Sequence, residues 1–218
     1  MEVGKYKIHI DGEWILEDLY VFPRAYEQVY FLMYSLLPHE DNDAQDRIQQ
    51  AYSVFPWQGG YSAVNFYNRL KYVLPKKKRP SIISIEYASP GWIELGLLLG
   101  VAVSVERLVK TIANTIKQAN ETYNDVHDGL QKRRLLRIET KRKELQLKKE
   151  ELEYVQQALL TMSTLLGFKN IEDINQRTGN PYKTLKILLS FYRRIRTLAE
   201  YQVVSLNCRD EFTSCKYH

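Results

Sequence analysis

The stretch from residue 97 to residue 166 constrains the fold more than any other part of the chain. In its first half the apolar residues are three or four positions apart, which predicts one amphipathic helix from about residue 89 to 128. In its second half an apolar residue recurs every seven positions, at Ile138, Leu145, Leu152, Leu159 and Leu166, and the last two heptads add Val155 and Met162. We expect a helical hairpin, residues 92–128 against 130–166, or a self-associating coiled coil, because a single long helix cannot bury such a face. A solvated helix with one apolar edge is the alternative.

The first 88 residues have a different pattern. Residues 6–10 alternate as a strand, Asp11-Gly12 is a turn signal, and residues 13–20 read as the returning strand. Helical spacing follows over residues 25–37, and a further strand is expected over residues 81–87. The predicted fold class is therefore α+β: a small N-terminal sheet-and-helix unit followed by a coiled-coil-like region of long helices, mostly α overall.

Four segments are expected along the chain. These are an α+β domain over 1–88, long helices over 89–166, a C-terminal helical pair over 167–206 and a tail over 207–218. Gly167 marks the end of the long helices, and Thr178-Gly179-Asn180-Pro181 reads as a turn between the last two helices, with an Asn cap and Pro at the first helical position.

Charge is segregated along the chain. Residues 1–50 have 4 basic and 10 acidic side chains, whereas residues 51–80 have 6 basic and none acidic. The net charge of +5, with 26% charged and 44% hydrophobic residues, is typical of a soluble globular protein and excludes a disordered or collagen-like chain. The segregation fits either a choice of partner or attraction between two parts of the fold.

No catalytic constellation is present in the sequence. The only two cysteines, Cys208 and Cys215, have no second Cys or His pair at zinc spacing, and no phosphate loop, dinucleotide fingerprint or nucleophile elbow occurs. We expect a protein without enzymatic activity, cofactor or metal; a catalytic site assembled from residues scattered along the chain is the alternative. Two thiols and an N-terminus without an apolar leader fit the cytoplasm.

The strongest apolar run covers residues 95–105, between Glu94 and Glu106. It is 11 residues long, whereas a spanning helix needs about 20. A buried helix is expected, with an interfacial segment as the alternative. Gly96 and Gly100 would let that helix approach a neighbour closely, in the fold or in a membrane.

Two basic places are candidates for nucleic acid or another polyanion. The first is the loop Lys76, Lys77, Lys78 and Arg79 between two prolines, which could instead dock on the acidic first 50 residues. The second is residues 171–189, whose apolar spacing around Thr178-Gly179 resembles a helix-turn-helix, although Asn175 stands where a small residue is usual. In that reading Tyr182, Lys183, Thr184 and Lys186 face the groove and Arg193, Arg194 and Arg196 reach phosphates. Plain helix packing is the alternative.

The order of a strand, Ser89-Pro90-Gly91, an apolar helix and a Lys/Glu-rich helix resembles a loose set of uncharacterised bacterial proteins. The resemblance covers roughly residues 81–165. It implies an association with phage-defence systems and no catalytic residue.

Taken together, these features predict a non-enzymatic assembly or adaptor subunit. It would form homo-oligomers or bind a protein partner through residues 92–166, with an aromatic patch as a second contact. The expected interface residues are Trp57, Tyr61, Trp92, Ile138, Leu145, Leu152, Val155, Leu159 and Met162. A nucleic-acid-binding protein is the first alternative and a membrane-associated effector the second.

Overall fold

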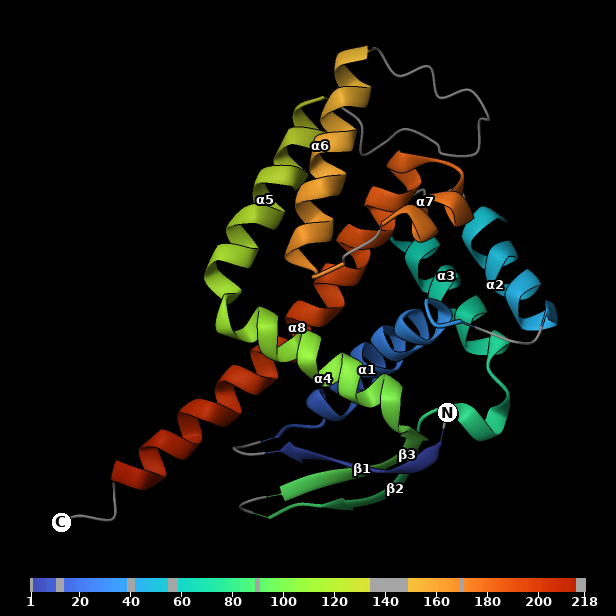
Figure 1. Cartoon of the computed structure of the whole chain (residues 1–218). Coiled ribbons are helices and arrows are strands. Elements are labelled where there is room, and N and C mark those ends of the chain that lie inside the picture. Colours follow the sequence, from blue (N-terminus) through green and yellow to red (C-terminus); the bar gives the residue numbers. More distant parts are fainter. Residues whose placement is uncertain are drawn as a thin grey trace. The chain divides into compact units, whose positions relative to one another are not determined.

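Figure 1 shows a computed structural model of the chain. It describes residues 2–10, 14–38, 42–54, 59–88, 91–133, 149–168 and 171–214, without the side chains of residues 54, 59–61, 173 and 203–214. The mostly helical α+β class is confirmed: helices α1 to α8 accompany a three-stranded antiparallel sheet.

The chain folds into two compact units. The first comprises Met1–Tyr34, Leu74–Asn114 and Arg194–His218, and the second Ser35–Val73 and Thr115–Arg193. Each unit therefore combines segments that are distant in sequence, whereas the sequence suggested continuous domains.

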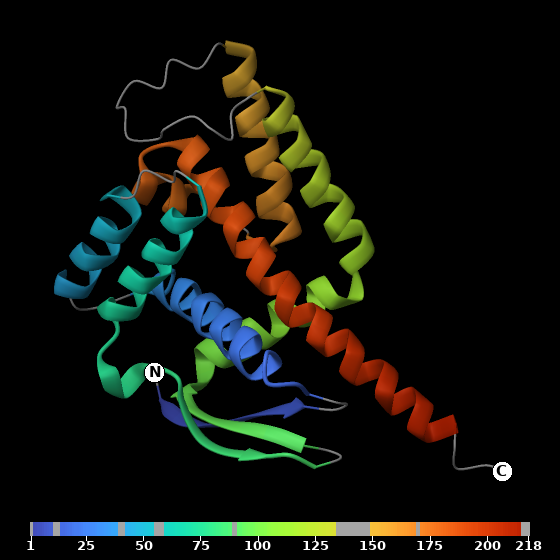
Figure 2. The ribbon, with the colours of Figure 1, turned by 180° about the vertical axis from the view of Figure 1, so that it is seen from behind.

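The first unit contains the sheet, most of α1, α4 and the C-terminal part of α8. Its elements are β1 (Val3–Ile10), α1 (Asp18–Ser35), the 3-10 turn η1 (Lys76–Lys78), β2 (Ser81–Glu86), β3 (Gly91–Leu98) and α4 (Leu99–Asn114). The strand order is β1-β3-β2, so β3 is central and β2 lies at an edge. In the views of Figures 1 and 2, α1 and α4 lie on the same side of the sheet.

Buried and partly covered residues alternate along β3, and the buried ones form part of the core of this unit. Ile93, Leu95 and Leu97 are buried, while the residues between them are only partly covered. Tyr30 of α1 ties the layers together, because its hydroxyl accepts a hydrogen bond from the Leu98 amide (3.0 Å) and donates one to the Lys78 carbonyl (3.0 Å). The sheet is thus anchored on α1 through one buried phenol.

Two sequence predictions in this unit are wrong. The strand β1 pairs with β3 rather than with residues 13–20, and Asp18 begins α1, with Pro23 inside the helix. The helix expected from residue 89 begins only at Leu99, since residues 91–98 form β3. The apolar run 95–105 is therefore strand up to Leu98 and helix from Leu99, and Gly96 and Gly100 do not share a helix.

The second unit is helical. It contains α2 (Asn42–Val54), α3 (Gly59–Val73), α5 (Ile116–Lys132), α6 (Lys149–Leu165), α7 (Glu172–Thr178) and the first part of α8 (Pro181–Ser214). Aromatic rings fill part of its core, as Tyr52 and Phe66 meet edge to face at 5.1 Å and Tyr123 stacks on Tyr192 at 5.0 Å. Because α8 continues to Ser214, the expected tail is helical up to that residue.

Helices α5 and α6 pack side by side (Figure 2), so part of the expected hairpin exists. The Tyr154 hydroxyl donates to the Val126 carbonyl (3.1 Å), and Arg133 lies 3.9 Å from the Tyr154 ring centre. Tyr154 fits there because position 129 is glycine: a Cβ at that position would overlap its hydroxyl. The hairpin partner is thus the 17-residue α5, not one helix from residue 92.

The turn between α7 and α8 matches the sequence prediction. Gly179 takes the left-handed conformation (φ 64°) that favours glycine, and Pro181 is the first residue of α8. The Asn180 side-chain oxygen accepts from the amides of Tyr182 (2.9 Å) and Lys183 (3.3 Å). Asn180 is therefore the N-cap of α8.

Candidate functional site

The edge strand β2 exposes three isoleucines. Ile82, Ile83 and Ile85 are 57%, 45% and 48% exposed. Ile82 pairs with Leu95 and Ile85 with Ile93, both buried residues of β3, so these two point to the side of the sheet that carries the core. Ile83 sits at an irregularity of the ladder, and its side chain lies over Gly96.

A groove of about 360 Å³ runs between this strand and α1. Leu19 and Pro23 border it on the helix side, and Ile82 on the strand side. Leu19 and Tyr20 of α1 are themselves exposed. We call the set Leu19, Tyr20, Ile82, Ile83 and Ile85 the apolar edge.

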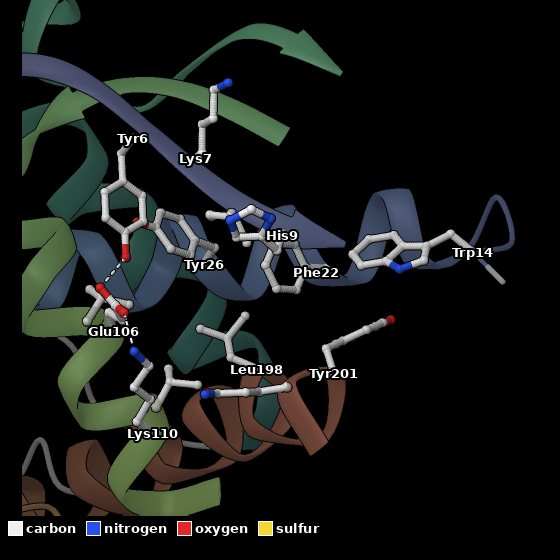
Figure 3. A pocket seen from close by; sticks show the side chains of 14 residues that line it. Tyr6, Lys7, His9, Trp14, Phe22, Tyr26, Glu106, Lys110, Leu198 and Tyr201 are labelled. Atoms are coloured by element: carbon white, nitrogen blue, oxygen red, sulfur yellow. Dashed lines mark hydrogen bonds and ion pairs between the residues drawn. The ribbon is translucent and has the colours of Figure 1, made fainter. Parts of the chain in front are cut away.

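A second hollow of the first unit, here called the aromatic cavity, also has a volume of about 360 Å³. Its walls come from β1, α1, α4 and α8 (Figure 3). At one end, Trp14 packs against Tyr201 (5.2 Å between ring centres) and Phe22 (5.4 Å). The Tyr201 hydroxyl donates to Asp18 (2.6 Å). Burial raises the pKa of Tyr201, and this hydrogen bond raises it further.

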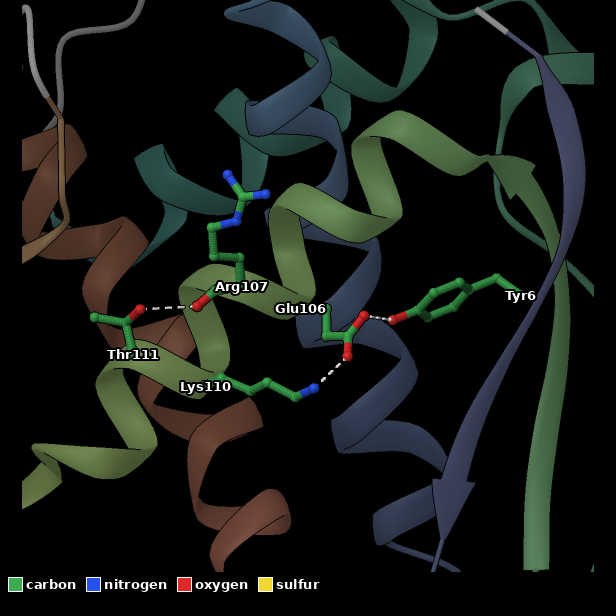
Figure 4. Close-up of polar contacts among 5 residues, drawn as sticks. All are labelled: Tyr6, Glu106, Arg107, Lys110 and Thr111. Carbon is green, nitrogen blue, oxygen red and sulfur yellow. Dashed lines mark hydrogen bonds and ion pairs between the residues drawn. The ribbon is translucent and has the colours of Figure 1, made fainter.

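Polar groups gather at the other end of the aromatic cavity. Glu106 accepts from the Tyr6 hydroxyl (2.5 Å) on one oxygen and from the Lys110 ammonium (2.5 Å) on the other (Figure 4). The bonds from Lys110 and then Tyr6 hold the pKa of Glu106 below its usual value, so the carboxylate is charged. Arg107, next to Glu106 in α4, points away from it.

Tyr26 of α1 lines the same end. It is 6% exposed, and its hydroxyl has no hydrogen-bond partner within the described part of the chain. Its ring lies beside Tyr6, and its hydroxyl is on the side of Tyr6 and Glu106 (Figure 3). Burial, with smaller contributions from Tyr6, Tyr30 and Glu106, raises the pKa of Tyr26, so the phenol is neutral.

The predicted basic loop forms an exposed turn. Lys76, Lys77 and Lys78 make up η1 and are exposed, whereas Arg79 is half-buried and donates to the Leu74 carbonyl (3.0 Å). Among the described residues, no ion pair joins the three lysines to an acidic side chain. The three lysines are therefore accessible to a polyanion, whereas the Arg79 side chain is hydrogen-bonded within the fold.

The groove-facing residues of the helix-turn-helix hypothesis are mostly buried, which corrects it. Tyr182, Lys183 and Thr184 are buried. Lys183 donates to the Ser53 carbonyl (2.8 Å), and Thr184 bonds to Asn175 (2.8 Å). Lys186 lies 4.5 Å from the Tyr182 ring centre, and burial lowers its pKa to about 8. This face packs inside the second unit and cannot read a groove, because Tyr182, Lys183 and Thr184 are buried there and Lys183 and Thr184 already have hydrogen-bond partners.

The three C-terminal arginines have different surroundings. Arg193 is exposed, Arg194 donates to the Gln28 side chain (2.5 Å), and the Arg196 Nε lies 3.5 Å from Glu200. Of the three, Arg194 is therefore engaged in holding α1 to α8 rather than reaching a phosphate.

Most residues of the expected interface are either buried in the fold or lie outside the described residues. Val155, Leu159 and Met162 are in the core of the second unit, so their predicted contact with a partner is wrong: they pack within the fold. Leu152 is exposed (37%), and Trp92 of β3 is half-buried with the Lys7 ammonium 4.5 Å from its ring centre. Trp57, Ile138, Leu145 and the Tyr61 side chain lie outside the described residues.

No protein-family model, curated protein or solved structure matches this chain. Within the described ranges, no helix is long and apolar enough to cross a membrane, and no cluster of three or more His, Cys, Asp or Glu side chains could hold a metal ion.

The sequence did not point to the apolar edge or to the aromatic cavity. The cavity brings together Tyr6, Tyr26, Glu106 and Tyr201, which come from four elements, and Trp14, which precedes α1, so they share no local motif. For the apolar edge a signal was present: the segment SIISIEY predicts a strand with isoleucine at both phases, and such a strand is either central or exposed at an edge.

Proposed function

We propose that the protein is a non-enzymatic assembly subunit that pairs with a second copy of itself through strand β2. The observation that carries the proposal is the exposure of Ile82, Ile83 and Ile85 on a strand that, in the described part of the chain, has a neighbour on one side only. An edge strand offers unpaired backbone groups to another strand, and exposed apolar side chains supply the free energy of association.

The protection that usually blocks such an edge is weak here. Natural edge strands carry lysines, prolines or inward-pointing charges. Within β2 the only charged residue is Glu86, at its end, and Pro80 precedes the strand. Six residues with three isoleucines are therefore left free to pair.

The apolar edge also fits a two-fold arrangement. If two β2 strands pair antiparallel, the core-side faces of both sheets become continuous. Ile82, Ile85, Leu19 and Tyr20 of both copies then lie on one side and can cover each other. A contact of this kind is isologous, the commonest type among homodimers.

Charge favours the antiparallel direction. The basic turn Lys76–Lys78 precedes β2 and Glu86 ends it. Antiparallel pairing brings Glu86 of each copy toward the basic turn of the other and keeps the two basic turns at opposite ends. Parallel pairing would set the six lysines of the two copies side by side, at an electrostatic cost.

This interface replaces the long-helix interface that the heptads suggested, because Val155, Leu159 and Met162 are used inside the second unit. The Ser89-Pro90-Gly91 step resembles that of bacterial proteins that accompany phage-defence systems, so we include defence complexes among the assemblies that such a subunit would join.

Cysteine cross-linking tests the pairing. In a chain with Cys208 and Cys215 replaced by serine, Ser84→Cys should give a disulfide-linked dimer under mild oxidation, since residues near the middle of two antiparallel strands come within disulfide range. Thr161→Cys, exposed on α6, is the matched control and should stay monomeric on a non-reducing gel. Equal cross-linking of the two variants, or none, contradicts the proposal.

A second candidate function is polyanion binding at the basic turn, favoured by the exposure of Lys76, Lys77 and Lys78 without acidic partners among the described residues. Replacing the three lysines with serine should remove salt-sensitive retention of duplex DNA in a gel shift. Lys117→Ser together with Lys132→Ser, exposed on α5, serves as control. Retention that survives the triple change rules this candidate out.

A further inference from the structure

The aromatic cavity has the size and composition of a small-molecule site. Its volume of about 360 Å³ falls in the lower part of the range of ~300–1,000 Å³ for such sites, which suits a ligand of two or three rings. Ile8, Phe22, Val105 and Val109 supply apolar surface between its two ends. The proposed pairing of β2 does not use Ile8, Val105 or Val109, whereas Phe22 also lines the groove beside β2.

An unsatisfied group lies in the wall of this cavity. Tyr26 is almost fully buried, yet its hydroxyl has no partner within the described residues. Buried hydroxyls nearly always find a partner, and one that lines a hollow can find it in a ligand. A phenol can donate or accept, so it does not by itself select the ligand.

The carboxylate of Glu106 makes that selection. Each of its oxygens accepts one bond, from Tyr6 or from Lys110, and each retains capacity for a second. Since both bonds favour the charged form, Glu106 is a fixed acceptor beside Tyr26. Lys110 balances its charge, so the cavity does not require a cationic ligand. The complement is a neutral N–H donor attached to an apolar ring.

We propose that the aromatic cavity binds a small aromatic compound that carries an N–H donor. The rings lie against Phe22, Val105 and Val109, and the N–H points to Glu106 and Tyr26. Arylamines and fused heteroaromatic rings with a ring N–H belong to this class.

The test uses N-phenyl-1-naphthylamine, a neutral fluorescent arylamine whose emission rises in apolar sites. We expect saturable binding with one site per chain. Val109→Trp fills the cavity and should weaken binding at least tenfold. Val103→Trp is the matched control on the same helix, because Val103 is 47% exposed and Val109 only 8%. Circular dichroism confirms that both variants fold.

Two further variants change the polar groups that face the ligand N–H without changing the shape of the cavity. Glu106→Gln and Tyr26→Phe should each weaken binding three- to tenfold. The N-methylated probe, which lacks the N–H, should bind the wild type less tightly and should not distinguish wild type from Glu106→Gln. These comparisons remain decisive if Val109→Trp fails to fold.

Two results would overturn the proposal. One is binding that Val109→Trp, Glu106→Gln and Tyr26→Phe all leave unchanged. The other is binding that disappears in the Ile82→Lys/Ile85→Lys chain, since the probe would then report the apolar edge. Because that chain keeps the cavity, failure of this proposal and failure of the β2 pairing are distinguishable.

Discussion

At the scale of single residues, we expect opposite changes in stability when two tyrosines of α1 lose their hydroxyl groups. Tyr26 and Tyr30 are one helical turn apart and both are buried. The Tyr30 hydroxyl makes two hydrogen bonds, whereas that of Tyr26 makes none within the described chain. Burial raises the pKa of both, that of Tyr30 to about 12. The two residues differ in hydrogen bonding, and removing the hydroxyl oxygen of each one tests this difference.

Tyr26→Phe should raise the free energy of unfolding by up to about 1 kcal/mol, because it removes a buried polar group without a partner. Tyr30→Phe should lower it by about 1–2 kcal/mol, because it leaves the Leu98 amide without its acceptor. Urea denaturation of the two variants measures both. A loss of stability in Tyr26→Phe equal to that in Tyr30→Phe would show that the Tyr26 hydroxyl has a partner.

Lys186 gives a prediction about pH. Burial lowers its pKa from 10.5 to about 8. Below pH 8 both the folded and the unfolded chain carry the charge, and the folded state bears the cost of burying it. Between pH 8 and 10.5 the folded chain has lost the proton while the unfolded chain keeps it, so this residue makes the protein more stable as pH rises.

Lys186→Met should therefore stabilise the protein on the order of 1 kcal/mol at pH 7, a value that allows for partial exposure. The gain over wild type should shrink toward zero at pH 10.5. Chemical denaturation at the two pH values measures the gain, with Lys117→Met on the exposed face of α5 as control. A gain that does not depend on pH would contradict the buried charge.

At the scale of elements, the α5–α6 pair depends on one glycine. Alanine has a higher helix propensity than glycine by ~1 kcal/mol, so propensity alone predicts that Gly129→Ala stabilises α5. In the structure the new Cβ would overlap Tyr154, which also bonds to Val126. The packing effect opposes the propensity effect, and the two can be separated.

We expect Gly129→Ala to destabilise the protein by about 1–2 kcal/mol, as overpacking does elsewhere. In a Tyr154→Ala background the same change should stabilise by up to about 1 kcal/mol, since the overlap is gone and only propensity remains. A double-mutant cycle by thermal or urea denaturation measures the coupling. The same sign in both backgrounds would mean that Tyr154 does not pack on Gly129.

Elements defined by local chemistry were predictable from the sequence. The Asn180-Pro181 start of α8, the strand β2 and the apolar seam of α6 all follow from caps, alternation or periodicity. Strand β3 was missed because Leu95 to Val105 is apolar at nearly every position, and such a run has no period that separates a buried strand from a helix.

The candidate sites were less predictable than the elements. Their residues meet only through tertiary structure: Tyr6 and Glu106 are a hundred positions apart and come from β1 and α4. The basic residues of α8 were conspicuous in sequence, yet Lys183 is buried with a backbone carbonyl as its partner. A charge count cannot show that a lysine caps a neighbouring helix.

At the scale of the whole molecule, the proposed function requires that the chain pairs with a second copy of itself. In a monomer the apolar edge is exposed to solvent. An antiparallel pair of β2 strands covers the apolar edges of both copies at once. The helices that looked most like an interface instead bury their seam within the second unit.

The most direct test is the mass of the protein in solution, measured by sedimentation equilibrium at several concentrations. If β2 pairs with itself, the wild type has twice the 25.7 kDa chain mass and Ile82→Lys/Ile85→Lys is a monomer. Leu160→Lys, on α6 and 62% exposed, should remain dimeric. A wild-type chain that stays at 25.7 kDa over the whole concentration range would contradict the account.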